Sequence, residues 1–274
     1  MALIHATVMS NALGRTVPLH VVLPVDKYAH DGTLMGSTQP LKTLYLLHGL
    51  VGSSVDWVTG TRIQRWAEDR NLAVIMPSGD NAFYVDSGPY ANYGAFVGEE
   101  LVALTRRMFP LSSAREDTFI AGLSMGGFGA LRNGLKYHTT FGAIASLSAP
   151  LDLFDPARQG PGAHVPYQMY LGPVDSAVNT DNNPLFTARQ LLRRRASGER
   201  LLLPDVYLAC GAEDRLLPSN REFRDAVAGT ALNVTYSETP GGHDWDYWDT
   251  TIADVLEWLP LDAPTAGMSS GNVR

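Results

Sequence analysis

The chain has only one cysteine, Cys210, among its 274 residues. A single cysteine excludes an intramolecular disulfide and any cysteine-based zinc cluster. No other cluster of metal-ligating residues is visible in the sequence, so we expect no metal site. Such sparse use of cysteine fits a reducing compartment.

Long apolar runs and an excess of positive charge are also absent from the sequence. No uninterrupted apolar stretch approaches the ~20 residues that a membrane-spanning helix needs. Residues 1–13 contain no Lys or Arg ahead of an apolar core, unlike a secretory signal. The 21 Lys and Arg are outnumbered by 28 Asp and Glu, and the net charge of −7 would repel nucleic acid and anionic lipid. We expect a cytoplasmic protein with no nucleic-acid or membrane partner and with a neutral or weakly charged substrate.

The sequence does contain enough apolar side chains for a sizeable core. Hydrophobic residues make up 45% and charged residues 18% of the chain, as in an ordinary globular protein. The length is near the upper limit for one hydrophobic core. We therefore expect residues 1–274 to form a single domain.

Short apolar runs alternate with stretches of helical spacing along the chain. Residues 72–76 and 118–121 are of strand type, whereas residues 94–109 and 125–137 have helical spacing. This alternation predicts βαβ units and a mostly parallel twisted sheet flanked by helices. The other expected strands are 16–23, 43–47, 141–147, 205–210 and 232–236, and the other expected helices are 219–228 and 247–259.

Two segments depart from this alternation. Residues 150–204 carry several prolines and glycines, aromatic residues and a cluster of arginines, which predict an inserted cap with at least one helix. Residues 261–274 are rich in small and polar residues and predict a flexible tail.

The motif Gly-Leu-Ser-Met-Gly at 122–126 lies between a predicted strand and a predicted helix. A G-x-S-x-G turn in that context lifts the serine hydroxyl above the sheet, and its glycines avoid clashes with neighbouring elements. The helix that follows directs its free N–H groups toward developing negative charge. Glycines that only allow tight packing of a strand on a helix are the alternative, but the strand–turn–helix context favours Ser124 as a nucleophile.

A serine nucleophile on this kind of turn is followed along the chain by an acid and then by a histidine. His243 is the one histidine after the last predicted strand, and it lies on a glycine-rich turn that can project it over the sheet edge. Such a histidine can accept the serine proton and return it to the leaving group. A surface histidine without a catalytic role is the alternative, and chain order favours the catalytic interpretation.

Asp214 is the preferred acid, because it lies on the turn after the predicted strand 205–210. The acid must accept the imidazole Nδ1 hydrogen and stabilise the imidazolium ion. Glu213, Asp244 and Asp152 remain alternative acids.

Two backbone N–H groups must stabilise the oxyanion of the tetrahedral intermediate. One comes from the residue after the nucleophile, Met125, and the other from an early loop after a strand. That loop is His-Gly-Leu-Val-Gly at 48–52, in which Leu50 is the expected donor. A simple strand end at His48-Gly49 is the alternative.

Four blocks together give the sequence a specific resemblance. The chain resembles the esterase D group of α/β-hydrolases from about residue 16 to residue 259, and the serine block is its most specific part. Within that group it is most similar to the tributyrin esterases and less similar to the S-formylglutathione hydrolases. The four blocks are Leu-His-Gly-Leu at 47–50, Met-Pro-Ser-Gly-Asp-Asn at 76–81, Gly-Leu-Ser-Met-Gly-Gly-Phe-Gly-Ala-Leu at 122–131 and Gly-His at 242–243.

The resemblance implies an α/β-hydrolase fold and cofactor-free hydrolysis of small-molecule, short-chain acyl esters through an acyl-enzyme on Ser124. It leaves open a thioesterase of the S-formylglutathione hydrolase type and an acyltransferase of the mycolyltransferase type. S-formylglutathione hydrolases typically have cysteine near the position of Gly52, which favours the ester hydrolase here. A hydrolase-like binding protein is disfavoured, because all three catalytic residue types are present. Relatives often form homo-oligomers, although the sequence indicates no interface.

In this fold, a segment inserted after the strand that follows the nucleophile lies above the catalytic face. We therefore expect Tyr167, Tyr170 and Phe186 to form a roof over the acyl pocket. A small roofed pocket would favour acetyl to butyryl esters over longer chains.

Overall fold

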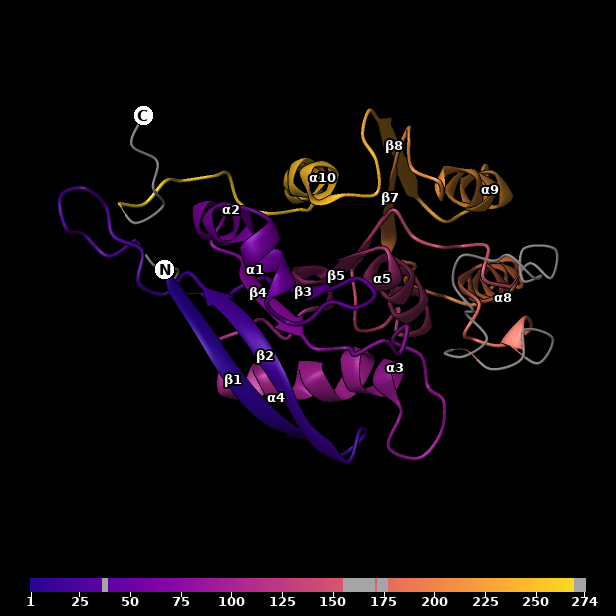
Figure 1. Cartoon of the computed structure of the whole chain (residues 1–274), viewed down its shortest axis with the longest axis horizontal. Coiled ribbons are helices and arrows are strands. Elements are labelled where there is room, and N and C mark those ends of the chain that lie inside the picture. Colours follow the sequence, from indigo (N-terminus) through magenta and orange to yellow (C-terminus); the bar gives the residue numbers. More distant parts are fainter. Residues whose placement is uncertain (36–38, 155–170, 172–176, 269–274) are drawn as a thin grey trace.

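The computed structural model describes residues 1–35, 39–154, 171 and 177–268 (Figure 1). Eight strands form one sheet in the order β1-β2-β4-β3-β5-β6-β7-β8. The β1–β2 and β2–β4 pairs are antiparallel, whereas β3 to β8 run parallel to one another. The prediction of a mostly parallel sheet flanked by helices is therefore confirmed. The strands are β1 (Ala2–Ser10), β2 (Arg15–Leu23), β3 (Thr43–Leu47), β4 (Ala73–Pro77), β5 (Thr118–Leu123), β6 (Ala143–Leu147), β7 (Asp205–Gly211) and β8 (Val234–Thr239).

Helices cover both faces of the sheet, with α2 and α10 on one side and α4 and α5 on the other (Figure 1). Successive side chains of a strand point to opposite faces, so Leu44 and Leu46 pack with α10, whereas Tyr45 packs in the cluster of α4 and α5. The central strands are buried on both faces, as a parallel sheet between two helical layers requires. The helices are α1 (Asp56–Gly60), α2 (Ile63–Asp69), α3 (Tyr93–Ala95), α4 (Leu101–Met108), α5 (Met125–Lys136), α8 (Pro184–Ala196), α9 (Leu217–Val227) and α10 (Trp245–Trp258), with a π-helical turn (Phe96–Glu100) between α3 and α4 and a 3₁₀ turn (Arg115–Asp117) before β5.

Three features of the fold differ from the sequence prediction. The first strand, β1, was not predicted, because it is an edge strand whose outward side chains are exposed and whose apolar residues therefore form no continuous run. The last strand lies about two residues later than expected, where its pairing with β7 sets its position. The short helices α1 and α2 were also missed.

The predicted cap, residues 150–204, lies partly outside the described residues. Its described part contains α8, and the side chain of Asn183 caps that helix by accepting hydrogen bonds from the N–H groups of Leu185 and Phe186. The segment predicted to be flexible, residues 261–274, is described as far as residue 268 and makes backbone hydrogen bonds to distant parts of the chain. Thr265 N donates to Asp69 O, and Met268 N donates to Tyr28 O.

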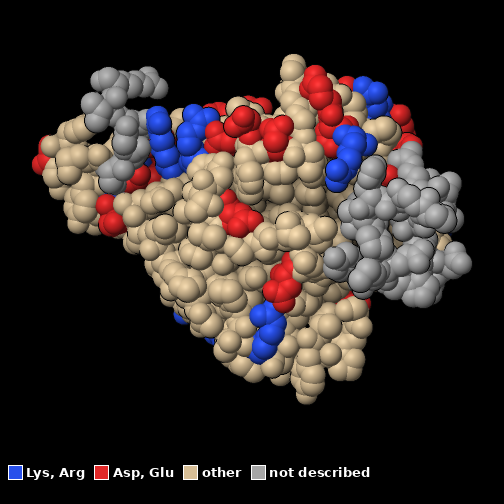
Figure 2. Space-filling model, viewed as in Figure 1, with Lys and Arg blue, Asp and Glu red and all other residues tan. Residues whose placement is uncertain are grey.

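Charged side chains are unevenly distributed on the face shown in Figure 2. Asp and Glu, with a few Lys and Arg among them, gather along the upper edge near α10, β8 and α9, whereas the centre of this face carries few charges. In the part of the chain that the structure describes, no helix has the length and apolar character needed to cross a membrane.

The parallel strands β3 and β5 to β8 all end at the same edge of the sheet. Loops at that edge are the usual place for binding sites in open α/β sheets. Leu50 follows β3, Ser124 follows β5, Asp214 follows β7 and His243 follows β8. The topology thus gathers residues that are up to about two hundred positions apart in the chain.

Candidate active site

Ser124 occupies a strained turn between β5 and α5. Its backbone has a φ of 52° and a ψ of −119°, a left-handed conformation that non-glycine residues rarely adopt. Its N–H donates to Leu147 O at 2.8 Å, which holds the turn against β6. A Cβ atom at Gly122 would overlap the Gly126 carbonyl, and one at Gly126 would overlap the Leu47 carbonyl. Both glycines are therefore needed for the tight turn that exposes the Ser124 hydroxyl.

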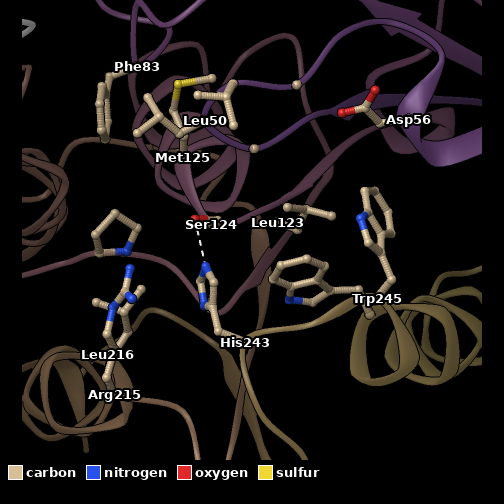
Figure 3. A pocket seen from close by; sticks show the side chains of 15 residues that line it. Leu50, Asp56, Phe83, Leu123, Ser124, Met125, Arg215, Leu216, His243 and Trp245 are labelled. Atoms are coloured by element: carbon tan, nitrogen blue, oxygen red, sulfur yellow. Dashed lines mark hydrogen bonds between the residues drawn. The ribbon is translucent and has the colours of Figure 1, made fainter. Parts of the chain in front are cut away.

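Ser124, His243 and Asp214 form a continuous chain of hydrogen bonds (Figure 3). His243 Nε2 lies 3.0 Å from Ser124 Oγ, and His243 Nδ1 lies 2.8 Å from Asp214 Oδ2. An ionised carboxylate only accepts hydrogen bonds, so Nδ1 carries the proton and Nε2 is free to accept the one on Ser124. The arrangement can therefore remove a proton from the serine hydroxyl and hold the resulting imidazolium ion beside a carboxylate.

The Asp214 carboxylate is buried and held from several sides. Leu216 N donates to Asp214 Oδ1 at 2.9 Å, in addition to the bond from His243. Burial raises the pKa of Asp214, but the hydrogen bonds from His243, Leu216 and Ser148 outweigh this effect and leave the pKa below its usual value. Asp214 is thus ionised at neutral pH.

The alternative acids have other contacts. Glu213 accepts a hydrogen bond from Gly241 N, and Asp244 caps α10 by accepting one from Tyr247 N at 3.0 Å. Asp152 lies beyond β6, and its carboxylate is partly buried. Asp214 is the carboxylate that lies within hydrogen-bonding distance of His243.

Trp248 and Ser148 support the His243 ring, and neither was predicted from the sequence. The Trp248 ring meets His243 edge-on, with centroids 4.9 Å apart and an interplanar angle of 86°. Trp248 Nε1 donates to Ser148 Oγ at 3.2 Å. The signal in the sequence that could have found Trp248 was the group of aromatic residues at positions 245, 247 and 248, shortly after His243. Cys210 lies in the core near Asp214, and burial raises its pKa to about 12, so the thiol stays protonated.

The N–H groups of Leu50 and Met125 donate to no protein acceptor in the part of the chain that is described. Met125 is the first residue of α5, where an N–H lacks an intrahelical partner. Both residues line the pocket that contains Ser124. These two donors are therefore available to an oxygen atom bound beside the serine.

The pocket has a volume of about 330 Å³ and contains Ser124 near its centre. Figure 3 shows Asp56 and Trp245 at one end, and Arg215 and Leu216 at the other. The lining residues are Gly49, Leu50, Val51, Gly52, Asp56, Phe83, Leu123, Ser124, Met125, Pro150, Arg215, Leu216, His243, Trp245 and Trp248. Within the described ranges, no group of three or more His, Cys, Asp or Glu residues could hold a metal ion.

The roof predicted over the acyl pocket is only partly within the described residues. Tyr167 and Tyr170 lie outside the described residues. Phe186 lies in the first turn of α8, which packs along α5 and α9, and it is not among the described residues that line the pocket around Ser124. Its place in a roof over the acyl pocket stays a prediction.

The chain matches the model of the Putative esterase family over residues 10–259. It belongs to this family. It is 38% identical to an acetyl esterase of Caldicellulosiruptor saccharolyticus over 94% of this chain and 98% of the relative. The present chain also resembles two Staphylococcus aureus structures, the S-formylglutathione hydrolase FrmB and the fluorophosphonate-binding serine hydrolase F with bound substrate. With each of them it shares 30% sequence identity and a TM-score of 0.78, over 94% of this chain and 98% of the other.

These findings establish a carboxylic ester hydrolase with the α/β-hydrolase fold. The esterase contains site residues that sequence reasoning missed, namely Asp56, Phe83, Trp245 and Arg215. They follow β3, β4, β8 and β7 respectively, and each lies outside the blocks on which the resemblance rests. Only the shared edge of the sheet shows that they belong to one pocket.

Proposed function

We propose that this esterase hydrolyses short-chain acyl esters through an acyl-enzyme on Ser124, with His243 as general base and Asp214 as the acid that orients it. The observation that carries the proposal is the unbroken hydrogen-bonded chain from Asp214 through His243 to the Ser124 hydroxyl, which opens into a pocket of about 330 Å³. An acetyl esterase is among its relatives, which supports a small acyl group.

The proposed reaction has two similar halves. His243 Nε2 removes the Ser124 proton while Ser124 Oγ attacks the ester carbonyl carbon, and the carbonyl oxygen becomes an oxyanion that accepts hydrogen bonds from Leu50 N and Met125 N. The intermediate collapses as the alcohol leaves with the proton from His243. Water then attacks the acyl-enzyme, gives its proton to His243, and the acid is released as Ser124 Oγ regains a proton.

Replacement of the nucleophile tests this proposal. We expect Ser124→Ala to lower kcat by at least ~10⁴-fold without unfolding the protein, because the variant loses the covalent route but little packing. A fluorophosphonate should label the wild type on the peptide that contains Ser124 and should not label the variant. Ser197→Ala, at an exposed serine after α8, is the control and should keep both activity and label. Turnover near the wild-type value in Ser124→Ala would refute the mechanism.

A thioesterase is the second candidate, because the structural neighbours include proteins named S-formylglutathione hydrolase. One feature beside the pocket favours the ester. A Cβ atom at Gly52 would overlap Asp56 Oδ2, so the cysteine that the thioesterases typically have nearby would fit here only if the Asp56 side chain moved.

Competition between p-nitrophenyl acetate and S-formylglutathione decides between these two functions. We expect a higher kcat/KM for the ester. If kcat/KM were about tenfold or more higher for the thioester, a difference of ~1.4 kcal/mol in transition-state binding, the result would identify a thioesterase.

We further propose a cytoplasmic location for this activity and a substrate that diffuses freely as a small molecule. Cell fractionation with an activity stain would test the location. A homo-oligomer stays a prediction, and size-exclusion chromatography with light scattering would measure the oligomeric state.

A further inference from the structure

The imidazole of His48 lies beneath the loop that carries Leu50. His48 follows β3 and is 1% exposed. Its Nε2 lies 2.9 Å from Gly79 N, its Nδ1 lies 2.7 Å from Gly49 O, and its backbone oxygen accepts a hydrogen bond from Tyr84 Oη at 3.1 Å. The ring thus connects the loop after β3 to the loop after β4.

These contacts determine which nitrogen of His48 carries the proton. Gly79 N–H can only donate, so Nε2 must accept, and in a neutral ring the proton is then on Nδ1. Nδ1–H donates to the Gly49 carbonyl. Burial lowers the pKa of His48, against smaller opposing effects of Gly49 O, Asp56 and Asp80, which supports the neutral ring.

The bond to Gly49 O sets the direction of the next N–H group. The Gly49 carbonyl and the Leu50 N–H belong to one planar trans peptide, so they point in opposite directions. His48 Nδ1 and Gly52 N both hold the carbonyl, the latter at 3.2 Å. The Leu50 N–H is therefore turned away from His48, and it has no protein acceptor among the described residues.

Besides His48 Nδ1, only the longer backbone hydrogen bond from Gly52 N, at 3.2 Å, holds the Gly49 carbonyl among the described residues. Glycines tolerate a wide range of backbone angles, and Gly49 and Gly52 both lie in the loop. After Leu50, the loop is held by a hydrogen bond from Val51 N to Asn81 Oδ1 at 2.7 Å. Before Leu50, the side chain that holds the peptide is His48.

We propose that His48 is a positioning residue that keeps the Gly49–Leu50 peptide oriented as an oxyanion donor, by donating from Nδ1 to the Gly49 carbonyl. This inference rests on the proposed role of Leu50 in the esterase reaction. Without the bond, the peptide rotates, and a carbonyl oxygen rather than an N–H group faces the developing negative charge. Loss of this hydrogen bond therefore weakens stabilisation of the transition state and leaves substrate binding unchanged.

Two amide substitutions separate the two ring contacts. The terminal atoms of asparagine overlie Nδ1 of histidine, so His48→Asn keeps a donor for Gly49 O and loses the acceptor for Gly79 N. The terminal atoms of glutamine overlie Nε2, so His48→Gln keeps the acceptor for Gly79 N and loses the donor to Gly49 O. Both variants lose one buried hydrogen bond, and His48→Asn also loses more side-chain volume, so it is a control against loss of packing as the cause of a lower kcat.

We expect His48→Gln to lower kcat by roughly 10- to 100-fold with little change in KM, less than the ~10²–10³-fold cost of deleting an oxyanion donor outright. His48→Asn should keep most of its kcat. The inhibition constant of an alkyl trifluoromethyl ketone, whose adduct with Ser124 places an oxyanion in the same site, should rise in His48→Gln by a factor similar to the loss in kcat. Thermal unfolding should show that both variants fold, with the greater loss of stability in His48→Asn because its side chain is smaller.

Equal kcat losses in the two variants, or a change in KM alone, would overturn the proposal and leave His48 a structural residue. A wild-type kcat in His48→Gln would overturn it as well. Fluorophosphonate labelling of Ser124 separates this failure from that of the proposed function. If Ser124 labels normally and Ser124→Ala is inactive while His48→Gln turns over as the wild type does, only the role of His48 is wrong.

Discussion

At the scale of residues, Asp214 accepts the hydrogen bond that orients His243 while its near neighbour in the chain, Glu213, accepts one from Gly241 N. We predict a kcat loss of about 10²–10⁴-fold for Asp214→Asn, smaller than for Ser124→Ala, because the imidazole can still act weakly from the wrong tautomer. Glu213→Gln is the matched control and should be close to wild type. Steady-state kinetics of the three variants test the assignment, and a silent Asp214→Asn beside an impaired Glu213→Gln or Asp152→Asn would transfer the role to another acid.

The same carboxylate predicts a pH dependence of stability. The pKa of Asp214 in the folded protein is below its usual value, since the hydrogen bonds from His243 and Leu216 outweigh the effect of burial. Such a group stabilises the fold above its unfolded pKa of ~3.9 and loses this contribution as the pH falls through the folded pKa.

On acidification below pH ~4, the free energy of unfolding should therefore fall more steeply in the wild type than in Asp214→Asn. Urea unfolding at a series of pH values measures the difference. Parallel curves for the two proteins would show that the Asp214 carboxylate gains nothing from its partners.

At the scale of elements, α5 begins at the Ser124 turn and is anchored in its second half by Arg132, which is fully buried. Arg132 Nε donates to Asp181 O at 3.0 Å, and its Nη2 lies 3.2 Å from Asp86 and from the Asp181 carboxylate. Lys136 pairs with the same two carboxylates. The helix is thus tied to the loop after β4 and to the segment that leads into α8.

We predict that Arg132→Met destabilises the fold by roughly 3 kcal/mol, at the lower end for removal of one member of a buried ion pair. The lower end applies because Asp86 keeps Lys136 as a partner and Asp181 is about half exposed. Arg221→Met breaks the exposed pair with Glu238 and is the control, for which we expect little change. Thermal unfolding measures both, and equal small shifts would mean that the buried network adds nothing to stability.

At the scale of the whole molecule, the pocket is built by loops that converge at the carboxyl edge of the sheet. We propose that all of these loops belong to one domain, into which residues 150–204 are inserted. The pocket volume of about 330 Å³ must hold both the acyl and the alcohol part of a substrate, and it is near the small end for binding sites.

We therefore predict a higher kcat/KM for acetyl to butyryl esters than for octanoyl or longer esters. Each methylene group gains ~0.8 kcal/mol only while the pocket can bury it. A series of p-nitrophenyl esters tests this, since the shared leaving group confines the differences to the acyl chain. A kcat/KM that rises through the octanoyl ester would contradict a small acyl site.

The fold class and the three residues Ser124, His243 and Asp214 could be predicted from the sequence, because their signals are local motifs or follow from the order of elements along the chain. The Ser124 turn needs glycines at fixed spacing, so a five-residue motif is enough to find it. Chain order then indicated His243 and Asp214, which the structure brings within hydrogen-bonding distance of one another. The edge strand β1 escaped prediction because only one of its faces packs on the protein.

The sequence by itself therefore determined the alternating α/β architecture and the serine–histidine–aspartate contacts, since backbone sterics and the order of strands restrict both. Only the tertiary structure decided what surrounds them. The bond from Gly79 N to His48 spans 31 positions and that from Trp248 to Ser148 spans 100. The same is true of Asp56, which lines the pocket although the sequence did not indicate it. These pairings depend on how separate loops meet at one edge of the sheet, and no local spacing records that geometry.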